Sequence, residues 1–145
     1  MMENVMILKS SEIESQPLPG SSSQEGGSIK RIVYPQNVPT KSLFMGITEV
    51  NPGYSPHRWH NHVRNVAEGY EIVYPQGFEE IYYIISGRGT IQWKTPEGTL
   101  KEEEVTSGDT LFFPSGVREH QLLNSGTEKM VVAYIGSPIP QIKNE

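Results

Sequence analysis

Short runs of β-branched and aromatic residues recur along most of this 145-residue chain, with turn-forming residues between them. The runs are five to nine residues long and end near glycine, proline or asparagine, which is typical of strands joined by tight turns. No segment keeps a helical period over three turns, and the best helix candidate, residues 62–70, is short. We therefore expect an all-β protein, either a sandwich or a jelly-roll barrel. The runs are IKRIVY, SLFMGITEV, EEIYYIIS, GTIQWKT, TLFFP, HQLLN and MVVAYIG.

The N-terminal part of the chain has a different composition. Residues 10–29 are poor in large apolar side chains and rich in serine, glycine and proline, which is typical of flexible arms and long loops. We therefore expect an arm over residues 1–29 and one folded domain over residues 30–145. A chain of this length can bury a sizeable core without disulfide bonds or a structural metal ion to stabilise it.

Charge and composition exclude several classes of partner. The net charge is -5 and the basic residues are scattered, so a nucleic-acid interface is not expected. The chain has neither a basic, apolar leader pattern nor a run of about 18 apolar residues, so we expect a cytoplasmic protein without a membrane partner. It has no cysteine, which leaves imidazole and carboxylate as the available metal ligands.

Three of the four histidines lie within six positions, in the run PHRWHNH. Side chains alternate between the two faces of a strand, so His60 and His62 point the same way and can share one metal ion. His57 is out of phase with this pair and follows Pro56, where the strand has only begun. Its role stays open between an alternative ligand, an acid or base at the pocket mouth, and an exposed loop histidine.

Two later strands carry further candidate ligands. The run GFEEIYYIISGRG contains the adjacent carboxylates Glu79 and Glu80, and alternation lets only one of them share the face of the histidines. His120 follows a short apolar strand that lies between two turn signals.

These residues resemble the motifs of the small single-domain type-2 cupins. The first cupin motif runs Gly, five residues, His-x-His, three or four residues, Glu, six residues, Gly. Here six residues separate Gly53 from His60, and six separate Glu80 from Gly87, which selects Glu80 over Glu79. The resemblance implies a double-stranded β-helix, or jelly-roll barrel, that holds one divalent metal through His60, His62, Glu80 and His120.

The second cupin motif runs Gly, five residues, Pro-x-Gly, two residues, His, three residues, Asn. Gly108, Pro114 and Gly116 match it, His120 comes one residue late, and Asn124 follows at the family distance. The resemblance extends over roughly residues 27–134.

The largest departure from the family lies between His62 and Glu80, where this chain has seventeen residues, 63–79. We expect this insertion to leave and rejoin the barrel as a lid or pocket wall. Alternatively, Glu68 or Glu71 within it replaces Glu80 as the ligand.

Three imidazoles and one carboxylate would leave two open positions on an octahedral ion. This favours Mn, Fe or Ni; Zn is possible, although four protein ligands around it would resemble a closed structural site. Alternation from Glu80 and His120 places Tyr82 and Arg118 on the metal side. There Tyr82 could donate a proton or hydrogen bond, and Arg118 could bind a substrate carboxylate. Four aromatic residues are interpreted as packing residues: Trp59, Trp93, Phe112 and Phe113.

Two function classes follow from this site. The first is a metal-dependent enzyme, an isomerase, lyase, decarboxylase or dioxygenase, that acts on a small polar metabolite whose carboxylate or carbonyl chelates the metal. The second is a non-catalytic cupin that binds a small molecule or sugar. The complete ligand set favours the enzyme, but the residues specify neither a catalytic acid or base nor a reaction. The resemblance also implies a homodimer, in which the N-terminal arm is a candidate to cross to the partner.

Overall fold

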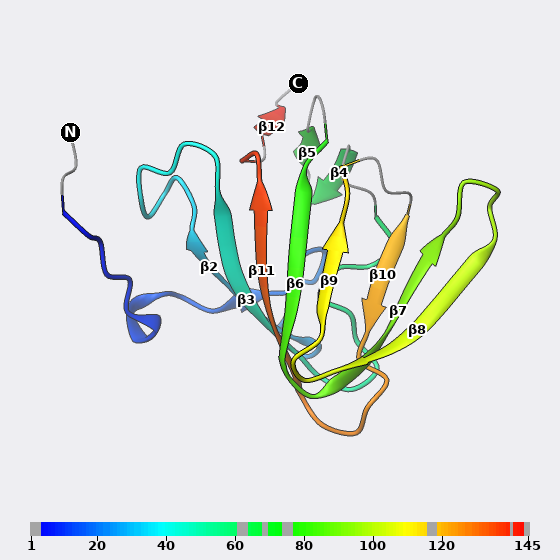
Figure 1. The fold of residues 1–145 in the computed structure, drawn as a ribbon. Coiled ribbons are helices and arrows are strands. Elements are labelled where there is room, and N and C mark those ends of the chain that lie inside the picture. The colour runs from blue at the N-terminus through cyan, green and yellow to red at the C-terminus, as the bar shows by residue number, and fades with distance from the viewer. Residues whose placement is uncertain are drawn as a thin grey trace.

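The computed structural model of the chain describes residues 4–60, 64–67, 70–73, 77–115, 119–139 and 141–143, and it confirms an all-β fold (Figure 1). The helical structure among these residues is one short turn of 3-10 helix, η1 (Ser10–Glu12). The strands are β1 (Gln16–Pro17), β2 (Gly27–Val33), β3 (Phe44–Val50), β4 (Arg64–Ala67), β5 (Tyr70–Val73), β6 (Glu79–Ser86), β7 (Arg88–Lys94), β8 (Leu100–Thr106), β9 (Thr110–Phe113), β10 (His120–Leu123), β11 (Met130–Ser137) and β12 (Gln141–Lys143).

The larger sheet has six antiparallel strands in the order β1-β2-β3-β11-β6-β9. β1, β2 and β3 follow one another in the chain, whereas the neighbours from β3 to β9 come from distant parts of the sequence, as they do in a jelly roll. Its long strands alternate between the core and the outside, which is the expected period of two. On β6, Glu80, Tyr82 and Ile84 are buried, whereas Ile81 and Tyr83 are exposed.

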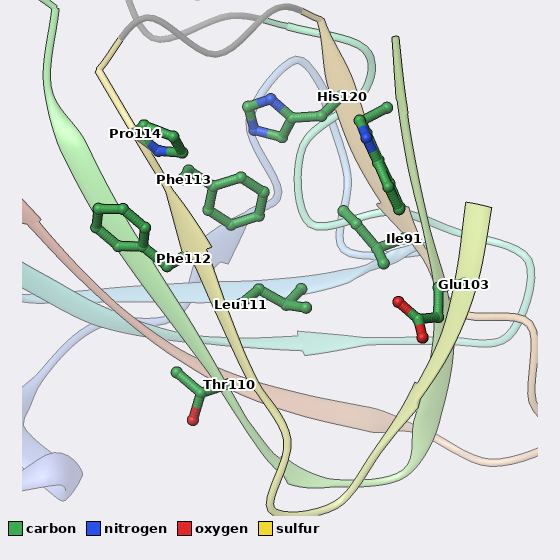
Figure 2. A pocket seen from close by; sticks show the side chains of 9 residues that line it. Ile91, Glu103, Thr110, Leu111, Phe112, Phe113, Pro114 and His120 are labelled. Carbon is green, nitrogen blue, oxygen red and sulfur yellow. The ribbon is translucent and has the colours of Figure 1, made fainter. Parts of the chain in front are cut away.

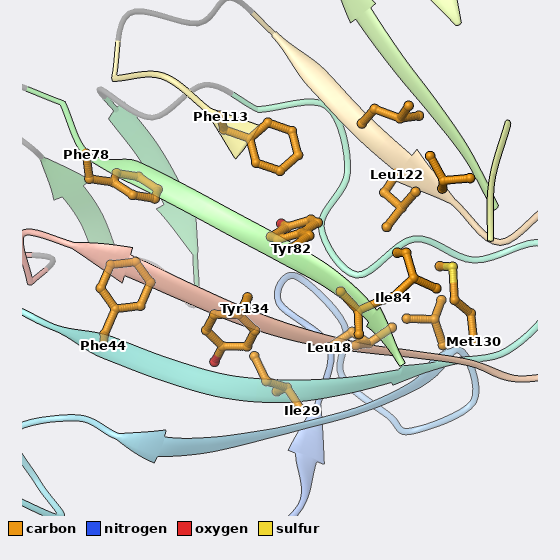
Figure 3. Packing of buried hydrophobic residues seen from close by; sticks show 14 residues of the cluster. Leu18, Ile29, Phe44, Phe78, Tyr82, Ile84, Phe113, Leu122, Met130 and Tyr134 are labelled. Carbon is orange, nitrogen blue, oxygen red and sulfur yellow. The ribbon is translucent and has the colours of Figure 1, made fainter. Parts of the chain in front are cut away.

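The second sheet has three strands in the order β10-β7-β8, and the core lies between it and the larger sheet (Figure 3). Ile84, Val132 and Met130 enter this core from the larger sheet, and Leu122 and Ile91 enter it from the smaller one. Burying each such side chain stabilises the fold by roughly 1.5–3 kcal/mol before entropy is counted. The structure is thus two antiparallel sheets packed face to face, as expected for a jelly roll.

Part of the expected N-terminal arm belongs to the larger sheet. The two residues of β1 pair with β2 of the same chain, and β2 itself begins at Gly27, before the expected boundary at Lys30. Leu18 is only 3% exposed and packs in the core. Leu18 is a large apolar residue in a mostly polar segment, so burying it holds the segment against the sheet.

The insertion after His62 forms strands where the sequence suggested, at best, a short helix. The backbones of β4 and β5 pair with each other, and β12 from the end of the chain pairs with β5. Figure 1 shows this third sheet at the end of the molecule where β6 and β10 begin and β9 ends. Glu80, Phe113 and His120 lie on those strand ends, so the insertion lies at the end that carries candidate site residues. The described residues include no helix with the length and apolar character of a membrane span.

Candidate functional site

Two of the predicted histidines, from segments sixty residues apart, meet across a β-bridge. His60 and His120 are antiparallel bridge partners: the His60 N–H donates to the His120 carbonyl over 3.2 Å, and the His120 N–H donates back over 3.0 Å. Directly opposed residues in an antiparallel pair project from the same face, and their ring centroids are 4.4 Å apart. Both side chains are buried, with His120 only 1% exposed.

The tautomer of His60 follows from its hydrogen bond to the backbone. Its Nδ1 lies 2.7 Å from the Arg58 carbonyl oxygen, which can only accept, so Nδ1 carries the proton. In a neutral ring Nε2 then holds the lone pair, which is the form in which a histidine ligates a metal ion. The donor chemistry of His60 therefore fits a metal ligand.

His57 lies beside this pair. Its ring centroid is 4.0 Å from that of His60, with the ring planes inclined by 32°, and its side chain is half-buried. Its Nδ1 is 3.3 Å from the same Arg58 carbonyl oxygen. The structure thus places His57 against His60, which also faces His120, although the alternation of a regular strand puts His57 out of phase with His60.

Glu80 is the inward-facing member of the two adjacent carboxylates. It is 7% exposed, whereas Glu79 is exposed on the other face of β6. Burial raises the pKa of Glu80 to about 8, while a hydrogen bond from Tyr82 acts to lower it. A buried carboxyl with a raised pKa gains most from a nearby cation or a proton, so this donor also fits a metal site.

Phe113 connects the carboxylate side of the site to the histidine side. It opposes Glu80 in the β6–β9 register, and its ring makes an edge contact with Tyr82 at 4.8 Å. On its other side it stacks on His120, with centroids 4.3 Å apart and planes inclined by 21°. Phe112 and Phe113 are both expected to be packing residues, but alternation along β9 distinguishes them, because of the two only Phe113 faces inward.

Two of the predicted site residues, His62 and Arg118, lie outside the described residues. Within the described ranges, no three histidine, aspartate or glutamate side chains form a group that could hold a metal ion. The structure therefore describes His60, Glu80 and His120 of the predicted ligand set, with His57 beside His60 and Tyr82 beside Glu80.

A tyrosine pair, the buried Tyr134 and the partly buried Tyr34, lies within electrostatic reach of Glu80. The Tyr34 and Tyr134 hydroxyl oxygens are 2.8 Å apart, and Tyr134 neighbours Tyr82 in the β11–β6 register. Burial raises the pKa of both; for Tyr34, to about 12. The negative charge of Glu80 contributes in the same direction, and the positive charge of Arg31 opposes it. No pattern in the sequence indicates this pair, because a hundred residues separate its members.

A pocket of about 350 Å³ opens beside His120, between β9 and the β7–β8 hairpin (Figure 2). Its lining is mostly apolar and aromatic; Trp93 and Phe113 take part in it, and Phe112, whose side chain faces outward, borders it. These three residues were all interpreted as packing residues from the sequence. The predicted pocket residues Tyr82 and His57 are not in this lining.

Comparison with known proteins identifies solved structures of the same fold. One is a predicted oxalate decarboxylase from Thermotoga maritima, 22% identical, with a TM-score of 0.64 over 92% of this chain and 100% of the other. KdgF from Halomonas sp. is 16% identical, with a TM-score of 0.64 over 93% of this chain and 94% of the other. A variant of oxalate decarboxylase from Bacillus subtilis is 18% identical, with a TM-score of 0.68. That alignment covers 94% of this chain and 31% of the longer protein.

Likeness at these identities shows the fold. No protein-family model and no curated protein matches the chain in sequence.

Proposed function

We propose that this chain, which has the fold of the small cupins, binds one divalent metal ion and acts as an enzyme on a small metabolite that chelates the ion. The proposed ligands are His60, His62, Glu80 and His120. The observation that carries the proposal is the His60–His120 bridge, which holds two imidazoles together on one buried face. The proton on Nδ1 of His60 leaves its Nε2 able to ligate.

The donor set of imidazoles and one carboxylate favours Mn, Fe or Ni, with Zn possible. When bound, such an ion supplies Lewis acidity that polarises a chelated carboxylate or carbonyl. The residues around it have separate tasks. Tyr82 donates a hydrogen bond to Glu80 and holds it in place. Phe113 packs between Tyr82 and His120 and keeps water from that side of the site. Arg118 is proposed to bind a carboxylate of the substrate.

The names of the similar structures support an enzyme over a non-catalytic binding protein. Of the three compared structures, one is named as an oxalate decarboxylase and one as a predicted oxalate decarboxylase. Among the candidate reactions, isomerase, lyase, decarboxylase and dioxygenase, these names support decarboxylation. A cytoplasmic location stays a prediction from the sequence.

The test compares turnover with binding. Protein reconstituted with Mn, Fe or Ni is assayed against a panel of small carboxylic and keto acids, oxalate included, with and without oxygen. We expect turnover that disappears on chelation and returns when the metal is restored. Ligand binding without turnover would instead support the non-catalytic class, and turnover that persists after complete metal removal would contradict the proposed mechanism.

We also propose that the chain forms a homodimer through the outer face of the larger sheet. Phe112, Ile81 and Ile135 oppose one another across β9, β6 and β11 and are between 39% and 58% exposed. Tyr83 and Ile85 extend this row on the same face of β6. Contiguous exposed apolar surface of this kind is typical of association sites, and a flat sheet face can pack on its own symmetry copy.

Replacing Ile81 by lysine is expected to shift the protein from dimer to monomer in size-exclusion chromatography with light scattering, because the new charge would be buried in the interface. Thr99→Lys, on the exposed β7–β8 turn, is the control and should leave the mass unchanged. A dimer that persists in the Ile81 variant, or a monomeric wild type, would contradict this interface.

A further inference from the structure

The pocket beside His120 lies at the junction of the two sheets, and the register shows how its walls are built. His120 on β10 opposes Trp93 on β7, and Ile91 on β7 opposes Glu103 on β8, so these side chains share the inner face of the smaller sheet. Leu111 and Phe113 come from the inner face of β9. Figure 2 shows Leu111, Phe113 and Ile91 directed toward the same space, with His120 at one end.

The size and lining of this pocket suit an apolar group about as large as an aromatic ring. Its volume of about 350 Å³ lies at the lower end of the range for small-molecule sites, roughly 300–1,000 Å³. A cavity of about 150 Å³ can already accept benzene, so a ring and a short linker fit here. The flat side chains of Trp93 and Phe113 offer the stacked and edge contacts that aromatic groups favour.

The charge of the lining selects against an anionic group. Among the described lining residues, Glu103 carries the one carboxylate, and no lysine or arginine lines the pocket. A ligand carboxylate placed about 5 Å from Glu103 would lower the affinity roughly fourfold even where water screens the pair. The pocket therefore favours an uncharged part of a ligand.

We propose that the substrate has two parts: a chelating carboxylate or carbonyl that reaches the His120 end, and an uncharged, ring-sized apolar group that occupies the pocket between β9 and the β7–β8 hairpin. This inference rests on the proposed function, because it assigns the chelating end to the metal site. The proposed substrate therefore differs from oxalate, which is a dianion without an apolar part. Trp93, Leu111 and Phe113 are then specificity-determining residues, and Glu103 disfavours diacids.

The test uses the Trp59→Phe protein, in which Trp93 is the remaining tryptophan and reports on the pocket by its fluorescence. Trp59 is 37% exposed, lies under the Lys94 ammonium group and is not in the pocket lining. Three probes separate the two parts of the ligand. Acetohydroxamate carries only the chelating group, benzamide only the ring, and benzohydroxamate both. Each is titrated into nickel-loaded and metal-stripped protein, and the hydroxamates are also followed by the metal absorption spectrum.

We expect benzohydroxamate to bind nickel-loaded protein at least tenfold more tightly than acetohydroxamate, because the ring adds buried apolar contact. Benzamide should quench the fluorescence of Trp93 in both the nickel-loaded and the metal-stripped protein. Equal affinities for the two hydroxamates together with no response to benzamide would overturn the pocket, while leaving the metal site intact. A benzamide response in a protein that binds neither nickel nor acetohydroxamate would overturn the proposed function and leave the pocket standing.

A second pair of variants tests the role of Glu103. Wild-type protein should bind para-carboxybenzamide at least threefold more weakly than benzamide, and Glu103→Gln should remove this difference. Glu102→Gln is the matched control, because Glu102 lies on the other face of β8 and accepts a hydrogen bond from Gln92. Discrimination that survives in Glu103→Gln, or that disappears equally in both variants, would overturn the assignment of Glu103.

Discussion

Replacing His120 by alanine is expected to weaken metal binding at least about a hundredfold, the largest effect on the site that any single change should produce. Removing a residue that only orients a ligand already costs about 10–100-fold in metal affinity, so removing a ligand should cost at least as much. His120 is also the residue that joins the parts of the site: it bridges to His60 and stacks on Phe113. The change is measured by competitive metal titration against a chromophoric chelator.

His57→Ala provides the matched control, because His57 lies against His60 without belonging to the proposed ligand set. Its metal affinity should stay within about threefold of wild type. Melting curves of the metal-free proteins separate loss of the ligand from loss of the fold. A hundredfold loss in His57→Ala together with wild-type affinity in His120→Ala would exchange the roles of these two histidines and contradict the proposed site.

The largest expected effect on stability comes from Asn124→Asp, a change of nearly constant volume. The Asn124 side chain is 1% exposed; its amide nitrogen donates to the carbonyl oxygens of Val50, at 2.7 Å, and Glu128, at 2.9 Å. Aspartate has no donor to replace these bonds and would place a buried carboxylate against two carbonyl oxygens. We expect the free energy of unfolding to fall by about 3 kcal/mol or more at neutral pH, measured by urea denaturation.

Asn51→Asp is the control for this prediction. The Asn51 amide also donates to a carbonyl oxygen, that of Glu25 at 2.8 Å, but this bond is exposed to solvent. The loss should therefore be about 1 kcal/mol or less, because water can replace the bond. Equal losses in the two variants would show that burial of Asn124 does not matter as argued.

Asn124, which matches the last position of the second cupin motif, also helps to position the site through its backbone hydrogen bonds. Its backbone carbonyl accepts from the Gly53 N–H over 2.9 Å, and its N–H donates to the Tyr54 carbonyl over 2.8 Å. Further along, the Ser55 hydroxyl donates to the Leu122 carbonyl. These bonds hold the segment that starts at Gly53 alongside β10. The same pairing ends at the His60–His120 bridge. The two halves of the cupin pattern are thus joined physically as well as by resemblance.

The cupin spacing to Gly87 selected Glu80 over Glu79, and local alternation from Glu80 then predicted that Tyr82 shares its face of β6. Glu80 and Tyr82 are buried and Glu79 is exposed, as the period of a strand requires. The same rule applied to β9 distinguishes Phe113 from Phe112. These features depend only on neighbours in the sequence, so a pattern of residues can indicate them.

Contacts between distant segments were beyond the reach of such patterns. The Tyr34–Tyr134 pair and the position of Leu18 in the core depend on strand order, which the alternation within one strand does not contain. The pairing of β12 with β5 of the insertion also depends on strand order, so local patterns do not indicate it. The sequence pattern did not predict the pocket because its walls come from four strands, and each aromatic residue in it, taken alone, looks like a packing residue.

The central claim, that one metal ion is held by three imidazoles and Glu80, is tested most directly by elemental analysis of protein purified without chelators. We predict close to one equivalent of Mn, Fe or Ni per chain, and less than a tenth of an equivalent in the His60→Ala/His120→Ala double variant. An unchanged metal content in the double variant, or a wild-type protein that stays metal-free after reconstitution with each of these ions and with zinc, would contradict it.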